Sequence, residues 1–348
     1  MTKILGFADR NRLTVGMIVL TAFFYAFFMM ADRSQTHPGK RLEIRQNKEA
    51  GFQALKTRED IFKKNVSGHP QYSIAAGLLF LTVFFAGLGI DFWLLLAFFR
   101  RRSWIHETVL PYHPPWGLAD VLQIFVFMFF SEACIAFVEI LLSSAFNLKG
   151  MGHDFFILLN SLLRDMCVAL FVIYLVKEKF GENLSSVGLT LRSFFSNVKR
   201  GFAGYVAMIP VLALSLLSVA LLAQLFSYEP MPQDVVQVYL KKSADKHILL
   251  LTFFVTVLGP VIEEIFFRGF TYRAFRGRFG VFGAAIATAA IFAAFHMNLM
   301  AFLPIFVLGL FLTYLYEKTG SLVPSITAHV THNLVMVCLT LIFKSLSG

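Results

Sequence analysis

Long runs of apolar residues, each close to the length of a membrane-spanning helix, recur along this chain and restrict its fold more than any other feature. A helix rises about 1.5 Å per residue and needs roughly 20 apolar residues to cross a hydrocarbon core about 30 Å thick. Nine runs are candidates: 13–31, 72–99, 121–146, 155–176, 202–226, 248–267, 281–296, 299–316 and 322–343. The sequence therefore predicts an all-α, polytopic membrane bundle of about eight or nine transmembrane helices. Eight is the alternative because the short run 281–296 could continue its neighbour.

The composition supports a membrane protein and argues against a soluble one. Hydrophobic residues make up 57% of the chain and charged residues 15%, values that a globular domain with a polar surface hardly reaches. The net charge of +10 could suggest nucleic acid as a partner. The basic residues, however, form short clusters between apolar runs, where they would anchor loops at anionic membrane lipids. We therefore expect membrane lipids, and no nucleic acid, as partners.

The basic clusters also predict an orientation, because loops rich in Lys and Arg stay on the cytoplasmic side. They are 100–102; Lys177, Lys179, Arg192, Lys199 and Arg200; and Arg273, Arg276 and Arg278. These clusters fall in alternate loops, which we expect to be cytoplasmic. With nine spans the N-terminus would then be inside and the loop 32–70 outside, although that loop is also basic.

The N-terminal region has two parts, and the sequence of each part allows two interpretations. The run 13–31 could be a signal peptide or a membrane anchor, and its length and the lack of a small-residue cleavage site favour the anchor. The charged connection 32–70 is by default a solvated loop. Phe52, Leu55 and Phe62 are nevertheless spaced as on one side of a helix, so an interfacial amphipathic helix is the alternative.

Ionisable residues inside apolar runs cost roughly 2.5–3.5 kcal/mol each on insertion scales and therefore need partners or a function. One set is Asp91, Glu132, Glu139, Arg164 and Asp165. Interhelical pairing, with Arg164 as a partner of the glutamates, is the favoured explanation, and a role in substrate handling is the alternative. Cys134, Cys167 and Cys338 lie in apolar runs and predict neither disulfides nor a metal site.

A second polar set begins with two adjacent carboxylates, Glu263 and Glu264, which follow a long apolar run. On a helix Glu264 and Arg268 share a face and can form a charge-assisted pair, whereas Glu263 is turned by about 100°. Desolvation in an apolar pocket would make Glu263 a stronger base, as a general base near neutral pH requires. The alternative is that both glutamates are solvated at the membrane surface.

Two further polar positions follow on the next spans. Phe292 and His296 lie one helical turn apart, as do His329 and Asn333, so each pair shares a face. His329 and Asn333 could donate hydrogen bonds to an oxyanion, although such residues also join membrane helices by hydrogen bonds. Three polar clusters on successive spans are costly unless they meet in one site.

Taken together, the motifs resemble those of the CPBP family of CAAX proteases and bacteriocin-processing enzymes. The family pattern is Glu-Glu-x-x-x-Arg, then Phe-x-x-x-His, then His-x-x-x-Asn or Asp. This chain carries it as Glu263, Glu264 and Arg268, then Phe292 and His296, then His329 and Asn333. The resemblance covers roughly residues 248–343, and 267–273 also resembles bacterial members. It implies an integral protein of the bacterial cytoplasmic membrane.

The resemblance further implies an intramembrane endopeptidase in which Glu263 and His296 activate water while His329 and Asn333 stabilise the oxyanion. Glu264 and Arg268 would support the site, and no cofactor would be needed. Zinc is the alternative, since Glu263, His296 and His329 could supply three ligands, with His332 as a supporting or substitute ligand. There is no His-Glu-x-x-His pair, so the metal-free mechanism is favoured.

The sequence also predicts a division of the chain into three regions, and it leaves two classes of function open besides that of a peptidase. Residues 1–110 would form the anchor, charged loop and second span, 118–246 the supporting helices, and 247–345 the catalytic core. The substrate would be a membrane-embedded or lipid-modified peptide. A proton-coupled transporter also places Glu, His and Asn at membrane depth, but no internal duplication is visible. A catalytically silent membrane scaffold is the remaining alternative, against which the intact motifs argue.

Overall fold

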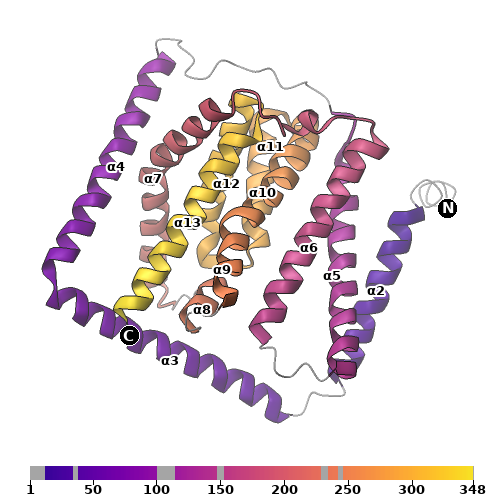
Figure 1. The fold of residues 1–348 in the computed structure, drawn as a ribbon, viewed down its shortest axis with the longest axis horizontal. Helices are drawn as coiled ribbons and strands as arrows, with labels where there is room; N and C mark the ends of the chain where they lie inside the picture. The colour runs from indigo at the N-terminus through magenta and orange to yellow at the C-terminus, as the bar shows by residue number, and fades with distance from the viewer. Residues whose placement is uncertain are drawn as a thin grey trace. The chain divides into compact units, whose positions relative to one another are not determined.

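The computed structural model describes residues 12–33, 38–99, 114–146, 153–228, 234–241 and 246–347, and every regular element in these ranges is a helix (Figure 1). The α-helices are α2 (Arg12–Arg33), α3 (Pro38–Gly68), α4 (Pro70–Phe99), α5 (Leu118–Phe146), α6 (His153–Tyr174), α7 (Phe194–Leu225), α8 (Asp234–Lys241), α9 (Lys246–Phe253), α10 (Gly259–Glu264), α11 (Arg273–Phe295), α12 (Leu299–Thr319) and α13 (Leu322–Leu346). Three π-helical stretches, η2 (Leu175–Lys179), η4 (Phe254–Leu258) and η5 (Ile265–Tyr272), and one 3₁₀ turn, η3 (Leu184–Val187), join them.

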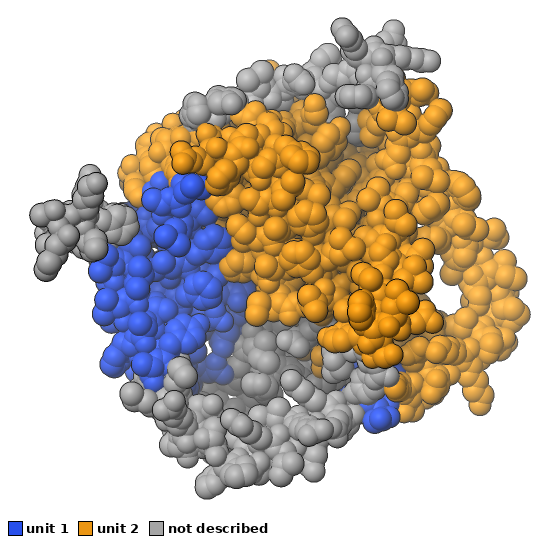
Figure 2. Space-filling model, turned by 180° about the vertical axis from the view of Figure 1, so that it is seen from behind, with its two compact units in different colours: residues 1–55, 118–175 blue, residues 56–117, 176–348 orange. Residues whose placement is uncertain are grey.

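The chain forms two compact units, which Figure 2 shows in different colours. The first consists of Met1–Leu55 and Leu118–Leu175, and within it α5 packs against both α2 and α6. The second consists of Lys56–Gly117 and Val176–Gly348. Within it α7 packs against α4, α12 and α13, and α12 also packs against α11 and α13. Every residue that the sequence predicts for the active site belongs to this second unit.

The membrane class predicted from the apolar runs is confirmed. Seven helices in the described part of the chain are long and apolar enough to cross a membrane. The number is below the predicted eight or nine for two reasons. The runs 248–267 and 281–296 fall in one helical stretch, Leu249–Phe295, which is interrupted at Gly280 with φ 69° and ψ −178°. Helix α2 covers the whole first run, but its described apolar part, Leu13–Ala26, is by itself shorter than a span.

The charged connection 32–70 is largely helical, so the default prediction of a solvated loop is wrong. Helix α3 occupies most of it, and its C-terminal half contacts the end of α13. The Phe62 ring lies 5.1 Å from the Phe343 ring, and Asn65 Nδ2 donates a 2.8 Å hydrogen bond to the Leu346 carbonyl. The helical spacing of apolar residues was therefore the more reliable signal, and two of them, Leu55 and Phe62, are half-buried on the helix.

Three ionisable residues in the apolar runs of the first unit have polar partners: Glu139, Arg164 and Asp165. Glu139 of α5 accepts a hydrogen bond from Asn160 of α6, which is the interhelical pairing that the sequence predicts. Arg164 pairs with the adjacent Asp165, with Nη2 and Oδ1 3.0 Å apart, rather than with either glutamate. A buried or half-buried charge is stabilised by the nearest opposite charge, and here that charge is one residue away.

Helices α12 and α13 form an antiparallel pair because capping residues stop one and start the other within two positions. Asn298 caps α12, its Oδ1 accepting a 3.0 Å bond from the Ala301 N–H. Gly320 ends α12 with φ 65°, a conformation that glycine adopts without strain. Ser321 Oγ then accepts a 3.2 Å bond from the Val323 N–H and starts α13. This turn fixes the helix that carries the third motif against α12.

The approach of α7 to α13 depends on Gly201. A Cβ atom at this position would lie 2.6 Å from the Pro324 carbonyl oxygen and 2.6 Å from Thr327 Cβ. Because one of these atoms belongs to the backbone, the helices would have to separate. We expect Gly201→Ala to lower the free energy of unfolding by about 1–3 kcal/mol, measured by thermal unfolding in detergent. The matched control is Gly77→Ala on α4, where nothing lies within 4 Å. Equal stability of the two variants would contradict the prediction.

Candidate active site

The two adjacent glutamates end a short α-helical segment that lies between two π-helical stretches. Helix α10 carries Glu263 and Glu264 as its last two residues, with η4 before it and η5 after it. A π-helical turn widens the helix by one residue, and such turns are frequent at functional sites. The sequence reads as one regular span through this region, so the irregularity was not predicted.

Proline in α10 explains how Asn333 is attached to this segment. In the π-helical register, the Val255 carbonyl would accept a bond from the N–H of residue 260, five positions later. Residue 260 is proline and has no N–H. Asn333 Nδ2 of α13 donates to this carbonyl instead, at 2.9 Å. One Nδ2 hydrogen of Asn333 is thus used to join α13 to η4, and the other is available to a ligand.

The pair predicted from helical spacing, Glu264 and Arg268, is present and fully buried. Arg268 Nη1 lies 2.7 Å from Glu264 Oε1, and both side chains are 0% exposed. Arg268 Nη2 donates a 3.2 Å bond to the Gly309 carbonyl of α12. The guanidinium carbon lies 4.4 Å from the centre of the Phe292 ring, a cation–π contact. Arg268 therefore connects η5 with both α11 and α12.

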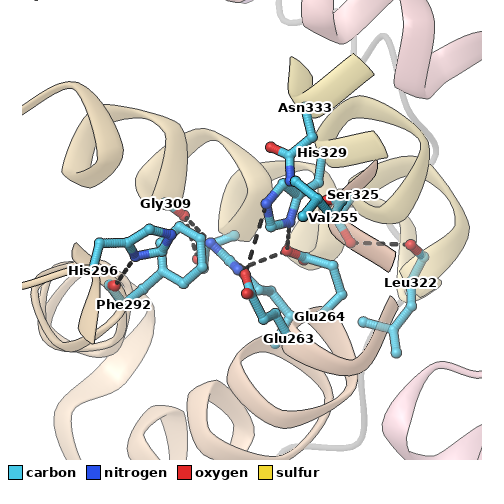
Figure 3. Close-up of polar contacts among 12 residues, drawn as sticks. Val255, Glu263, Glu264, Phe292, His296, Gly309, Leu322, Ser325, His329 and Asn333 are labelled. Carbon is cyan, nitrogen blue, oxygen red and sulfur yellow. Dashed lines mark hydrogen bonds and ion pairs between the residues drawn. The ribbon is translucent and has the colours of Figure 1, made fainter. Parts of the chain in front are cut away.

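His329 lies between the two glutamates (Figure 3). Its Nδ1 is 2.9 Å from Glu264 Oε1, and its Nε2 is 3.8 Å from Glu263 Oε2. A carboxylate oxygen accepts, so Nδ1 carries the proton of this hydrogen bond. The ring of His329 is also edge-on to Phe292 at 5.7 Å. Helical packing thus places the first and third motifs in direct contact.

His296 joins the cluster through Phe292, its partner in the second motif. The two rings are 4.9 Å apart and edge-on, as the predicted shared face requires. His296 Nδ1 is 2.9 Å from the Phe292 carbonyl oxygen. Because a carbonyl only accepts, Nδ1 is the protonated nitrogen and Nε2 of the neutral ring presents a lone pair. Nε2 is therefore an acceptor for a ligand or a water.

The two glutamates differ in their surroundings. The Glu264 side chain is 0% exposed and bonds both Arg268 and His329. The Glu263 side chain is 31% exposed and faces His329 at the longer distance of 3.8 Å. Glu264 is thus enclosed by protein groups, whereas Glu263 can be reached by a small molecule.

His332, which the sequence predicts as a supporting residue or substitute ligand, lies close enough to His329 and His296 to interact with both electrostatically. It packs edge-on against Tyr205 of α7, with ring centres 6.0 Å apart, and its buried Nδ1 has no hydrogen-bond partner among the described residues. His332 thus packs between α7 and α13, and its supporting role stays a prediction.

The alternative zinc ligands are not gathered into a metal site. Across the part of the chain that the structure describes, no three His, Cys, Asp or Glu side chains form a group that could hold a metal ion. In this structure Glu263, His296 and His329 do not form such a group.

Two backbone carbonyls of the site were missed by sequence reasoning. The Val255 carbonyl could have been found, because a proline inside a helical run leaves an unbonded carbonyl about one turn earlier. The Gly309 carbonyl could not. It accepts from Arg268 Nη2 and also from Thr313 Oγ1 at 2.8 Å. A side chain at this position would crowd Ala289 and Phe292 at 3.1–3.2 Å, a constraint visible only once α11 and α12 are packed.

Comparison with known proteins identifies the segment that holds these residues. Residues 245–335 match the family model described as type II CAAX prenyl endopeptidase Rce1-like. Neither the curated proteins nor the solved structures contain a significant match to the chain. The matched segment includes every residue of the cluster, from Val255 to Asn333. The part of this integral, multi-pass membrane protein that forms the candidate site thus matches the Rce1-like type II CAAX prenyl endopeptidases, which confirms the resemblance carried by the three motifs.

Proposed function

We propose that this protein is an intramembrane endopeptidase that hydrolyses a peptide bond of a membrane-associated substrate with water activated by Glu263. The observation that carries the proposal is the difference between the two adjacent carboxylates. Glu264 is fully buried and occupied by Arg268 and His329, whereas Glu263 is 31% exposed beside His329. A general base must reach both its water and the substrate, and of this pair only Glu263 has such access.

The attacking water would be held by two acceptors. Glu263 accepts one of its hydrogens, and the unprotonated Nε2 of His296 accepts the other. The Nδ1–H bond of His296 to the Phe292 carbonyl favours this tautomer and this ring orientation. A water bound through both hydrogens directs its lone pairs at the scissile carbonyl.

Attack transfers one water proton to Glu263 as the oxygen bonds to the carbonyl carbon. The carbonyl electron pair moves to its oxygen, and the resulting oxyanion accepts a hydrogen bond from Asn333 Nδ2, with His329 beside it as the second donor once its Nε2 carries a proton. When the C–N bond breaks, the leaving nitrogen takes the proton from Glu263. All atoms and protons are accounted for without a covalent intermediate.

The family match and the place of the site support a substrate class. The family name specifies prenylated CAAX peptides, and the residues of the site lie on helices long and apolar enough to cross a membrane. We propose a membrane-embedded or lipid-modified peptide, cleaved in a bacterial cytoplasmic membrane. The same setting disfavours a proton-coupled carrier, since the matched segment is that of a peptidase.

The proposal is tested by comparing membrane fractions of cells that lack the gene, cells that carry the wild-type chain and cells that carry Glu263→Gln. A substrate should accumulate uncleaved in the first and third and appear as its product in the second. Identical peptide patterns in the wild-type and Glu263→Gln cells would contradict the proposal. The cleaved peptide would also show whether the substrate carries a lipid.

Metal dependence gives a separate prediction. We expect cleavage by the purified protein to continue at its full rate after treatment with a strong chelator, because the proposed step needs only a base and hydrogen-bond donors. Metal analysis of the same sample should find much less than one zinc per chain. Activity that is lost on chelation and restored by zinc would overturn the metal-free mechanism while leaving the peptidase assignment intact.

A further inference from the structure

A short turn that precedes the matched segment contacts three of the elements that carry the site. The turn is η3 together with Gly188, the glycine that follows it. It packs against η5, against the last turn of α12 and against the first residue of α13. The five residues that meet here are all buried. We call them the η3 junction: Val187, Gly188, Gly269, Tyr316 and Leu322.

Two backbone carbonyls of the turn bind α12 and α13. The Val187 carbonyl accepts a 3.1 Å hydrogen bond from the Tyr316 hydroxyl, in the last turn of α12. The Gly188 carbonyl accepts a 2.9 Å bond from the N–H of Leu322, the first residue of α13. The first N–H groups of a helix have no carbonyl partner inside that helix. Gly188 therefore supplies one such partner to the helix that carries the third motif.

Two glycines allow the three elements to approach the turn. A Cβ atom at Gly269 would lie 2.9 Å from the Val187 carbonyl oxygen and 3.4 Å from Leu322 Cδ1. Gly188 has φ 86°, a left-handed conformation that other residues adopt only with strain, and a Cβ atom there would lie 2.5 Å from the Tyr316 ring. Neither position can take a side chain unless η3 moves away from its neighbours. The junction therefore sets the separation of these elements.

Each element that meets the turn also carries a group of the site. On η5 the junction glycine directly follows Arg268. Tyr316 lies seven residues after Gly309 on α12, and Leu322 lies seven residues before His329 on α13. Seven residues are two helical turns, about 10 Å, so the two members of each pair lie on one face of their helix. A shift at the junction would therefore move these groups relative to one another.

We propose that η3 and Gly188 position the groups of the active site that lie on η5, α12 and α13. The inference rests on the proposed function, because the distances maintained are those of the proposed hydrolysis. The 2.9 Å contact of Glu264 with His329 joins α13 to the residue directly before η5, and Arg268 joins η5 to the Gly309 carbonyl of α12. The turn lies outside residues 245–335, so the three family motifs do not include it.

The first test compares Gly188→Ala with Gly181→Ala, its matched control. Both glycines have positive φ, 86° and 65°, but nothing lies within 4 Å of a Cβ atom at Gly181. The probe is a synthetic peptide that spans the cleavage site found in the membrane comparison. We expect Gly188→Ala to lower kcat of the folded protein by roughly 100-fold, the effect of a displacement of about 1 Å. KM should change little, because the residues that contact the substrate are retained. Gly181→Ala should keep both constants.

A milder variant, Tyr316→Phe, serves if Gly188→Ala does not fold. It removes only the hydroxyl that donates to the Val187 carbonyl. We expect kcat to fall by about 3–10-fold, the range that corresponds to one net hydrogen bond, again with little change in KM. Tyr314→Phe makes the same change at an exposed residue of α12 and should keep wild-type kinetics.

Hydrogen exchange of the full chain in detergent tests the junction without any substrate. In Gly188→Ala the Leu322 N–H should lose its acceptor. We therefore expect faster exchange than in Gly181→Ala, both in peptides from η5 and in peptides from the first turn of α13.

The outcomes separate this inference from the proposed function. Folded Gly188→Ala and Tyr316→Phe proteins with wild-type kcat would overturn the inference, even if their midpoints of thermal unfolding were lower, because the junction would then be purely structural. Exchange in Gly188→Ala equal to that of its control would overturn it as well. A wild-type protein that does not cleave the peptide would contradict the proposed function, whereas faster exchange of η5 and α13 would still support the junction.

Discussion

Replacing Glu263 by glutamine should reduce cleavage of the native substrate by at least about 100-fold, the lower end of the contribution of a positioned general base. Glutamine has nearly the shape of glutamate and keeps one acceptor oxygen, but it cannot take a proton. Glu263 is partly exposed and lies 3.8 Å from His329, and its replacement leaves the buried Glu264–Arg268 ion pair intact. The protein should therefore insert and fold as the wild type does.

The measurement is the initial rate of product formation, with thermal unfolding in detergent recorded on the same samples. Glu178→Gln is the matched control, because it makes the same chemical change at an exposed residue of η2. Control and wild type should agree in both quantities. Cleavage by Glu263→Gln within a few-fold of wild type would remove Glu263 as the base. A parallel loss of folding would mean that its role is structural.

Spacing along the sequence predicted the parts of this site that depend on one helix. Glu264 and Arg268 are four residues apart and pair, and Phe292 and His296 do likewise. Such contacts follow from helical periodicity. They also tolerate a local irregularity, since Glu264 and Arg268 pair although Arg268 lies in the π-helical stretch η5. The sequence also predicted that the three motifs converge, because isolated polar groups in a membrane are costly.

Contacts between helices were predicted less well. From their spacing alone, His329 and Asn333 were predicted to have the same role, donation of hydrogen bonds to an oxyanion. The packing of α13 gives them different partners: His329 contacts the buried Glu264 carboxylate, and Asn333 contacts the Val255 backbone carbonyl. His332, three residues after His329, packs its ring against Tyr205 of α7. Which partner a polar side chain finds depends on the rotation of its helix against several neighbours, and hydrophobic patterning leaves that rotation undetermined when a helix is apolar all round.

Removing the buried cation should have the largest effect on stability. In Arg268→Met the Glu264 carboxylate would remain in a fully buried position without its main compensating charge. Breaking a buried ion pair from one side costs roughly 3–5 kcal/mol. The cation–π contact with Phe292 and the bond to the Gly309 carbonyl would be lost as well. We expect a sharply lower yield of folded protein and a lower midpoint of thermal unfolding.

The double variant Arg268→Met with Glu264→Gln separates charge from packing. Glutamine removes the uncompensated charge, and methionine retains much of the apolar volume of the arginine stem, so part of the lost stability should return. Arg278→Met, at an exposed position, is the matched control and should unfold as the wild type does. If the double variant were no more stable than Arg268→Met, the cost would come from lost packing against Phe292 and Gly309. Recovery of folding without recovery of cleavage would instead show that the Glu264–Arg268 pair is also needed for catalysis, because Glu264 contacts the His329 ring directly.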